Sequence, residues 1–175
     1  AVAYAMRPLG AIVFGHVGDR YGRRLTMLAS MGMMTAAMLA TALLPTQAQA
    51  GPAAGWMLLA RRCLMAFSVG GEYPGVVAYL MEGAPAERRG LITSLASAAS
   101  EVGALLAAGI AAITVASLDQ ASLLSWGWRI PFFFGAGLAG LILLARSKME
   151  ESPDFRRQQA MDSVPRHPLR HSLRH

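Results

Sequence analysis

Apolar residues are gathered into five long runs that short polar segments separate. The runs cover residues 1–17, 25–44, 55–82, 91–115 and 126–145. Each run is close to the roughly 20 residues of helix that cross the hydrocarbon core of a bilayer. The apolar positions do not alternate with a period of two, and the runs are about twice as long as a membrane-spanning strand. The pattern therefore predicts an all-α membrane protein with five transmembrane helices.

The composition agrees with this prediction and excludes other classes. Of the 175 residues, 54% are hydrophobic and 15% are charged, whereas about a quarter of the residues in a soluble domain are charged. The net charge of +6 would suit a nucleic-acid binder. The basic residues, however, lie between the apolar runs and in the tail, without a recognition helix or an aromatic–basic surface pattern. We therefore expect a lipid bilayer as the surroundings and no nucleic-acid partner.

The distribution of Lys and Arg predicts how the chain is oriented. Residues 18–24, residues 83–90 and the tail carry these cations, whereas the other two connections have none apart from Arg129 at the start of the last run. Cytoplasmic loops of membrane proteins are enriched in Lys and Arg. We therefore expect a multi-pass protein of the cell membrane, with both basic connections and the tail in the cytoplasm.

Two parts are expected: a helical bundle over residues 1–145 and a cytoplasmic basic tail, or the start of a central loop, over residues 146–175. Since position 1 is Ala, we expect the natural start of the protein to lie upstream. The single cysteine, Cys63, permits no internal disulfide. Three tail histidines stand four residues apart, but intervening prolines argue against the helix that would make them a metal site. These histidines are His167, His171 and His175.

The first connection carries glycines and charges at closely spaced positions, in the segment GHVGDRYGRR of residues 15–24. So short a connection needs glycines for its turn, and we assign this role to Gly18 and Gly22. Asp19 is expected to cap a helix or to accept hydrogen bonds from a neighbouring helix N-terminus. Taken alone, the arginines would be ordinary topology-setting residues in the headgroup region. The pattern as a whole is more specific, and its fixed residues are Gly15, Asp19, Arg20, Gly22, Arg23 and Arg24.

This pattern resembles the signature G-x-x-x-D-R-x-G-R-[KR] between helices 2 and 3 of the major facilitator superfamily. Other segments resemble one branch, the metabolite:proton symporters, and within it the proline/glycine betaine transporters. The sequence departs from that branch at Met65 and Ala66, where Gln and Gly are expected, and at Glu101 in helix 5. The similar segments are Arg7–Gly10, Phe67–Tyr73, Glu82–Gly90, Trp126–Phe132 and Glu150–Pro153.

The resemblance implies helices 2–6 of a six-helix N-terminal half. It also implies proton-coupled symport of a small polar metabolite or osmolyte, such as proline, betaine or an organic acid, by alternating access. The partners would then be the metabolite, protons and the missing C-terminal half. We expect neither an enzyme nor a cofactor, since His16 is the only histidine near a span and no nucleophile–base or metal set stands at mid-depth. The alternative is a truncated membrane fragment that transports nothing, because a major facilitator needs two halves around one cavity.

Ionisable residues inside the apolar runs are costly in a bilayer, which makes them candidates for the substrate or proton pathway. Arg61 is expected to snorkel outward, whereas Arg62 matches the helix 4 arginine of the family. Glu72 is either a structural partner of a basic residue or a proton carrier. Glu101 lies near mid-depth, where it is either a protonated structural residue or a titrating group with Arg7 and Arg62 as partners. The predicted pathway residues are Arg7, Arg62, Glu72 and Glu101.

Overall fold

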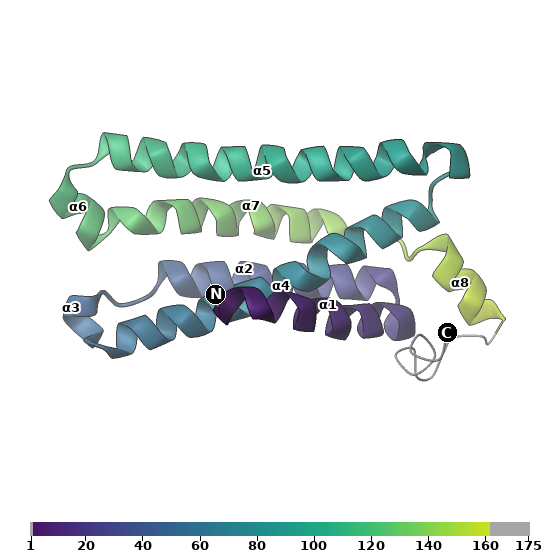
Figure 1. The fold of residues 1–175 in the computed structure, drawn as a ribbon, viewed down its shortest axis with the longest axis horizontal. Helices are drawn as coiled ribbons and strands as arrows, with labels where there is room; N and C mark the ends of the chain where they lie inside the picture. Colours follow the sequence, from purple (N-terminus) through teal and green to yellow (C-terminus); the bar gives the residue numbers. More distant parts are fainter. Residues whose placement is uncertain (1, 162–175) are drawn as a thin grey trace.

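Five long helices form an elongated bundle in the computed structural model, which describes residues 2–161 (Figure 1). Within those residues there is no strand. Each long helix corresponds to one of the five predicted runs, to within a few residues at each end. The long helices are α1 (Val2–Tyr21), α2 (Arg23–Ala42), α4 (Ala53–Glu82), α5 (Arg89–Ser117) and α7 (Ile130–Ser147).

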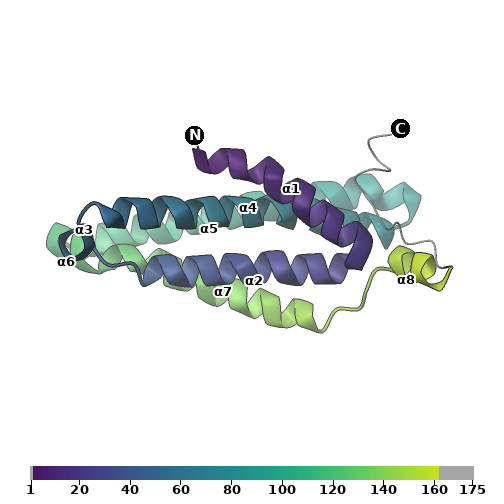
Figure 2. The same cartoon turned by 90° about the horizontal axis from the view of Figure 1, so that it is seen from below.

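The connections alternate between the two ends of the bundle (Figures 1 and 2). Two short helices, α3 (Gln47–Ala50) and α6 (Gln120–Ser125), lie at the same end of the bundle. The turn at Gly22, the 3-10 turn η1 (Ala86–Arg88) and the helix α8 (Pro153–Ala160) lie at the other end. The basic connections therefore share one end, as the charge pattern predicted.

Three of the long helices are long and apolar enough to cross a membrane by themselves. They are contained in the segments Arg23–Ala42, Ala86–Ser117 and Gly127–Ser147. The other two, α1 and α4, include the charged residues Arg7 and Arg62. These two helices make their most extensive contact with each other. The packing of α1 on α4 thus joins the two long helices that carry these arginines.

Glycine allows α1 and α4 to cross with their backbones in contact. A Cβ atom added to Gly10 would overlap the carbonyl group of Phe67, and one added to Gly70 would overlap the carbonyl group of Arg7. Small residues at a crossing permit this close approach between membrane helices. The crossing therefore holds the start of α1, including Arg7, in a defined position on α4.

The buried part of the bundle surrounds α2, which packs against both α4 and α7. Residues such as Met27, Met31 and Ala37 are almost completely buried there. By contrast, Thr114 is the only buried residue described along α5. A groove of about 410 Å³ lies between α2, α5 and α7 and is lined mainly by apolar side chains of these helices.

Two sequence-based boundaries differ from the structure. The helix α1 continues through Gly18 to Tyr21, so the predicted loop of residues 18–24 is reduced to a turn at Gly22. Gly18 is buried within the helix and is not a turn residue. The last long helix extends to Ser147, two residues beyond the end of the predicted apolar run of residues 126–145. Both corrections arise because helical hydrogen bonding continues into residues that are polar or small.

Candidate functional site

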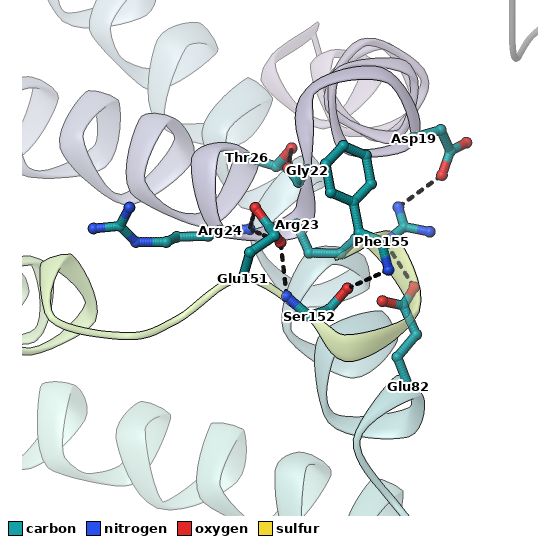
Figure 3. A network of polar contacts seen from close by, with 9 residues as sticks. All are labelled: Asp19, Gly22, Arg23, Arg24, Thr26, Glu82, Glu151, Ser152 and Phe155. Carbon is teal, nitrogen blue, oxygen red and sulfur yellow. Dashed lines mark hydrogen bonds and ion pairs between the residues drawn. The ribbon is translucent and has the colours of Figure 1, made fainter. Parts of the chain in front are cut away.

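A polar network at the basic end of the bundle links several helix ends to one another. The network is centred on the N-terminus of α2 (Figure 3). Gly22 precedes this helix and offers no side chain to cap it. The backbone N–H of Arg24 instead donates to both carboxylate oxygens of Glu151, at 3.0 and 3.3 Å. A carboxylate at a helix N-terminus satisfies orphan N–H groups and interacts favourably with the helix dipole. Glu151, from the segment that follows α7, therefore caps α2.

Gly22 is required at this turn for two reasons. Its φ angle of 105° lies in a region that residues with a side chain rarely adopt. A Cβ atom at this position would also overlap the carboxylate of Glu151. The prediction that Gly22 forms the turn is thus confirmed, and the same glycine leaves room for the capping group.

Arg23 connects the ends of three helices. Its Nη1 atom lies 2.8 Å from Oδ1 of Asp19 at the end of α1, and its Nε donates to Oε1 of Glu82 at the end of α4, at 2.9 Å. The side chain of Arg23 is 22% exposed and that of Glu82 is 21% exposed. Because Arg23 starts α2, these two ion pairs hold α1, α2 and α4 together at their basic end. The predicted capping role of Asp19 is wrong in this structure: Asp19 pairs with Arg23, and Glu151 supplies the cap.

The segment after Glu151 is tied into the same network. The backbone N–H of Ser152 donates to Glu151 at 2.9 Å, and the Ser152 hydroxyl accepts the N–H of Phe155 at 3.2 Å, which caps α8. The Arg156 side chain donates a hydrogen bond to the neighbouring Glu150 carboxylate and lowers the pKa of that carboxyl group. The first residues after α7 are thus anchored to the start of α2.

A second polar cluster links α2, α4 and α7 further from this end. One carboxylate oxygen of Glu72 pairs with the guanidinium of Arg146, and the other accepts the hydroxyl hydrogen of Ser30 at 2.7 Å. Ser30 is fully buried, and the two charged side chains are 18% and 21% exposed. Of the two alternatives for Glu72, this contact supports the structural partner of a basic residue.

A pocket of about 230 Å³ lies towards the other end of the bundle, between the start of α1 and the first half of α4. Arg7 and Arg62 both line it. The guanidinium of Arg7 lies over the ring of Tyr4, 4.7 Å from the ring centroid. The structure therefore brings together two of the four predicted pathway residues, Arg7 and Arg62, from different helices.

The other two predicted pathway residues lie elsewhere. Glu72 is engaged in the Arg146 cluster, and Glu101 is exposed on α5 without a hydrogen bond or ion pair among the described residues. The expected pairing of Glu101 with Arg7 or Arg62 does not occur. Arg61 also departs from expectation, because its Nη1 atom is buried without a partner in the described part of the chain instead of reaching outward.

Sequence reasoning missed several members of these clusters. The charge pattern places Arg146 in the basic tail, and Glu82 and Glu151 lie in the segments that resemble the family. For Glu151 the available signal is its sign, since an acid is stabilised beside a helix N-terminus. Ser30 carried no signal, because a serine in an apolar helix commonly bonds its own backbone. The tail histidines His167, His171 and His175 lie outside the described residues.

Comparison with known proteins agrees with the membrane bundle. The family described as "Sugar (and other) transporter" matches residues 1–169. The chain is 40% identical over 157 residues to a Staphylococcus aureus protein named "Putative proline/betaine transporter", covering 89% of this chain and 33% of that protein. It is 36% identical over 158 residues to the Escherichia coli shikimate transporter, covering 90% of this chain and 36% of the relative. The chain thus spans about a third of the length of the curated relatives it matches.

A solved structure shares the fold. A partially occluded, inward-open form of the xylose transporter XylE from E. coli superposes with a TM-score of 0.82 at 22% identity, covering 93% of this chain and 40% of XylE. Another XylE structure, described as a proton:xylose symporter of the major facilitator superfamily, gives a TM-score of 0.80. These similarities confirm the predicted helical fold. The match over nearly the whole sequence shows that the chain belongs to the family described as sugar (and other) transporters.

Proposed function

We propose that the chain supplies helices 2–6 of the N-terminal half of a secondary transporter, which moves a small polar metabolite together with protons by alternating access. Family membership supports transport, and the relatives named for proline/betaine and shikimate support a small polar substrate. The observation that carries the proposal is the pocket lined by Arg7 and Arg62, because charged residues inside a membrane bundle mark substrate and ion pathways.

The direct experiment is uptake by cells that express the full-length transporter containing this sequence. We expect accumulation of proline, glycine betaine or a small organic acid, and loss of accumulation when a protonophore collapses the proton gradient. Residues 1–175 expressed alone should insert without transporting, because alternating access needs two halves around the site. Absence of uptake from the full-length protein under every substrate and gradient would favour the alternative of a non-transporting membrane protein.

The proposed topology places the basic end of the bundle in the cytoplasm. In a Cys63→Ser background, we expect Gln120→Cys to react with a membrane-impermeant maleimide on intact cells. Tyr21→Cys should react only after permeabilisation. Tyr21 is 54% exposed and avoids the constrained Gly22 position. The physical reason is the concentration of Lys and Arg at one end. Reaction of both cysteines on intact cells would contradict this orientation.

For Asp19→Asn in the full-length transporter, we expect the turnover rate to fall by about tenfold or more while substrate affinity stays within about threefold, as for residues that act on conformational steps. Asp19 supports Arg23 at the end of the bundle opposite to the pocket. The matched control is Asp154→Asn, since Asp154 forms a longer, exposed pair with Arg157. Uptake kinetics and equilibrium binding separate the two quantities, and weakened binding with normal turnover would refute the assignment.

Glu101 is the proposed proton or cation-contact site on α5. In Glu101→Gln, we expect pH-driven uptake to be lost while exchange of substrate across the membrane persists, because the amide keeps the shape but cannot ionise. Glu101 is exposed and has no hydrogen-bond or ion-pair partner among the described residues. No contact of Glu101 in this part of the protein therefore supports a structural role for it. Glu87→Gln, in the exposed turn η1, serves as the control. Normal pH-driven uptake by Glu101→Gln would remove Glu101 from the pathway.

A further inference from the structure

We infer that Tyr73 of α4 positions Glu101 of α5 for the proton step of transport, through a hydrogen bond to Ser97 that holds one face of α5 towards α4. Tyr73 and Ser97 are positioning residues, and neither takes up the proton itself. This inference rests on the proposed function, in which Glu101 carries the proton or contacts a cation. It follows from one contact between two helices and from the arrangement of polar residues around α5.

The contact joins two hydroxyl groups. The phenolic oxygen of Tyr73 lies 2.8 Å from Oγ of Ser97. The Ser97 hydroxyl donates to the carbonyl of Thr93 at 3.2 Å, and a serine hydroxyl has only one hydrogen to give. Tyr73 is therefore the donor to Ser97. In the described part of the chain, no other side-chain hydrogen bond or ion pair joins α5 to another long helix, so this bond constrains how α5 is turned.

Glu101 shares the face of α5 that Tyr73 contacts. It lies four residues after Ser97, and such residues are neighbours on a helix surface, with Cβ atoms about 5–6 Å apart. The helices α4 and α5 run in opposite directions, since a short connection joins them at the basic end (Figure 1). The turn of α4 opposite Glu101 is therefore the one that contains Val69, which lines the pocket between α1 and α4. The contact thus keeps Glu101 on the side of α5 that faces α4, level with this pocket.

The polar side chains of α5 gather around the same contact. At about 100° of rotation per residue, those between Leu91 and Leu106 fall within an arc of about 120° whose centre is Ser97. Large apolar residues such as Val102 point the opposite way. Polar groups that face lipid are costly, so this arc is expected to face protein or water. The polar residues of the arc are Thr93, Ser94, Ser97, Ser100 and Glu101.

Few charged groups face this part of α5 from the elements packed against it. On α4, the residue beside Tyr73 is Glu72, which is held by its ion pair with Arg146. The other charged residues of α4 lie two or more turns from Tyr73, and no residue of α7 from 130 to 145 is ionisable. A change in the rotation of α5 would therefore alter the surroundings of Glu101 without breaking an ion pair. The turns at the two ends of α5 carry Glu87, Arg88 and Arg129.

The first test measures the orientation of α5 by cross-linking in the full-length transporter without other cysteines. Val69→Cys and Glu101→Cys should be joined by a flexible bismaleimide, because both lie one turn from the Tyr73 contact on facing sides. Val69→Cys with Val102→Cys is the control and should react slowly, since Val102 points about 100° away from Glu101. Adding Tyr73→Phe should slow the first reaction by about fivefold, the effect of one lost hydrogen bond. An unchanged rate would overturn the inference.

The second test compares two rates in proteoliposomes: uptake driven by an imposed pH gradient, and substrate exchange at equal pH on both sides. Tyr73→Phe and Ser97→Ala should each lower gradient-driven uptake by about fivefold or more. Exchange should stay within about twofold, because it requires no net proton movement. The pH dependence of uptake should also shift, whereas a general loss of folded protein would lower both rates equally. Ser97→Thr keeps the hydroxyl and should retain gradient-driven uptake.

Two matched controls separate the contact from the chemistry of the substitutions. Tyr79→Phe removes a tyrosine hydroxyl of α4 that bonds to the carbonyl of Glu150, away from α5. Ser94→Ala removes a serine hydroxyl of α5 that bonds to the carbonyl of Leu91 in its own helix. Both rates should stay within about twofold of the unmodified transporter for each control. A loss of gradient-driven uptake in Ser94→Ala equal to that in Ser97→Ala would overturn the inference.

The outcomes separate this inference from the proposed function. Normal gradient-driven uptake in Tyr73→Phe and Ser97→Ala, beside an active unmodified transporter, would overturn the inference and leave the proposed function intact. If Tyr73→Phe fails to fold, Ser97→Ala reports on the same bond from the other side. Absence of uptake by the unmodified transporter would refute the proposed function. Cross-linking that is slowed by Tyr73→Phe would still support the positioning contact in that case, and cross-linking that is not slowed would overturn it.

Discussion

Replacing Gly22 by alanine is expected to lower the free energy of unfolding by about 2–4 kcal/mol, the sum of backbone strain and a lost helix cap. The φ of 105° and ψ of 153° belong to a region that is almost exclusive to glycine. The added Cβ atom would also push the Glu151 carboxylate away from the backbone N–H of Arg24. Titration of the folded protein with sodium dodecyl sulfate in micelles measures the change.

The control is Gly32→Ala on the same helix, where an added Cβ atom meets nothing within 4 Å. Alanine in a helix interior is about 0.5–1 kcal/mol more favourable than glycine, so this variant should be unchanged or slightly more stable. Glu151→Gln should have a smaller effect than Gly22→Ala, because an amide oxygen still accepts the N–H of Arg24 although its charge is gone. Equal stability of Gly22→Ala and Gly32→Ala would refute the capping arrangement.

Replacing Glu72 by glutamine is expected to destabilise the bundle by about 3 kcal/mol, because it leaves the guanidinium of Arg146 largely buried without its counter-charge. Both side chains are less than a quarter exposed, so solvent screens the pair only in part. Arg146→Met should cost a similar amount by leaving the carboxylate unpaired. The double variant should be much less unstable than the sum of the two single variants.

This double-mutant cycle uses unfolding free energies of the four proteins in the same micelles. The Glu150–Arg156 pair is the matched control, because it joins the same residue types but its side chains are 81% and 52% exposed. Exposed pairs contribute little, so its cycle should show no measurable coupling. Additive effects of the Glu72 and Arg146 substitutions would show that the contact is not energetically significant. Such additivity would instead favour the hypothesis that Glu72 is a proton carrier.

Much of the fold could be read from the sequence because it depends on local composition. The length of each apolar run predicted the five long helices. Because basic and uncharged connections alternate along the chain, the sequence also predicted that the basic connections lie at the same end of the bundle. Gly22 was recognisable as a turn residue, since a tight turn between helices needs its conformational freedom. Helix boundaries were less accurate, because backbone hydrogen bonding carried α1 through Gly18 and α7 through Arg146.

The partners of the charged residues could not be read from the sequence. Each charge within a run was identifiable as costly, but the group that balances it lies far away along the chain. Glu151 caps α2 across 127 residues, and Arg146 meets Glu72 across 74. The expected pairing of Glu101 with Arg7 or Arg62 failed for the same reason, because overlapping depth does not establish that two helices face each other.

The sequence alone thus determined that this chain forms membrane helices, which end carries the positive charge, and which residues need a partner. These properties follow from hydrophobic run length and charge position, and both are local quantities. Only the tertiary structure showed that Arg7 and Arg62 line one pocket and that Glu72 forms an ion pair with Arg146. It also showed that Glu151, and not Asp19, caps α2. Those outcomes depend on how helices cross, and the crossing is set by backbone contact at Gly10 and Gly70 and by packing between distant segments.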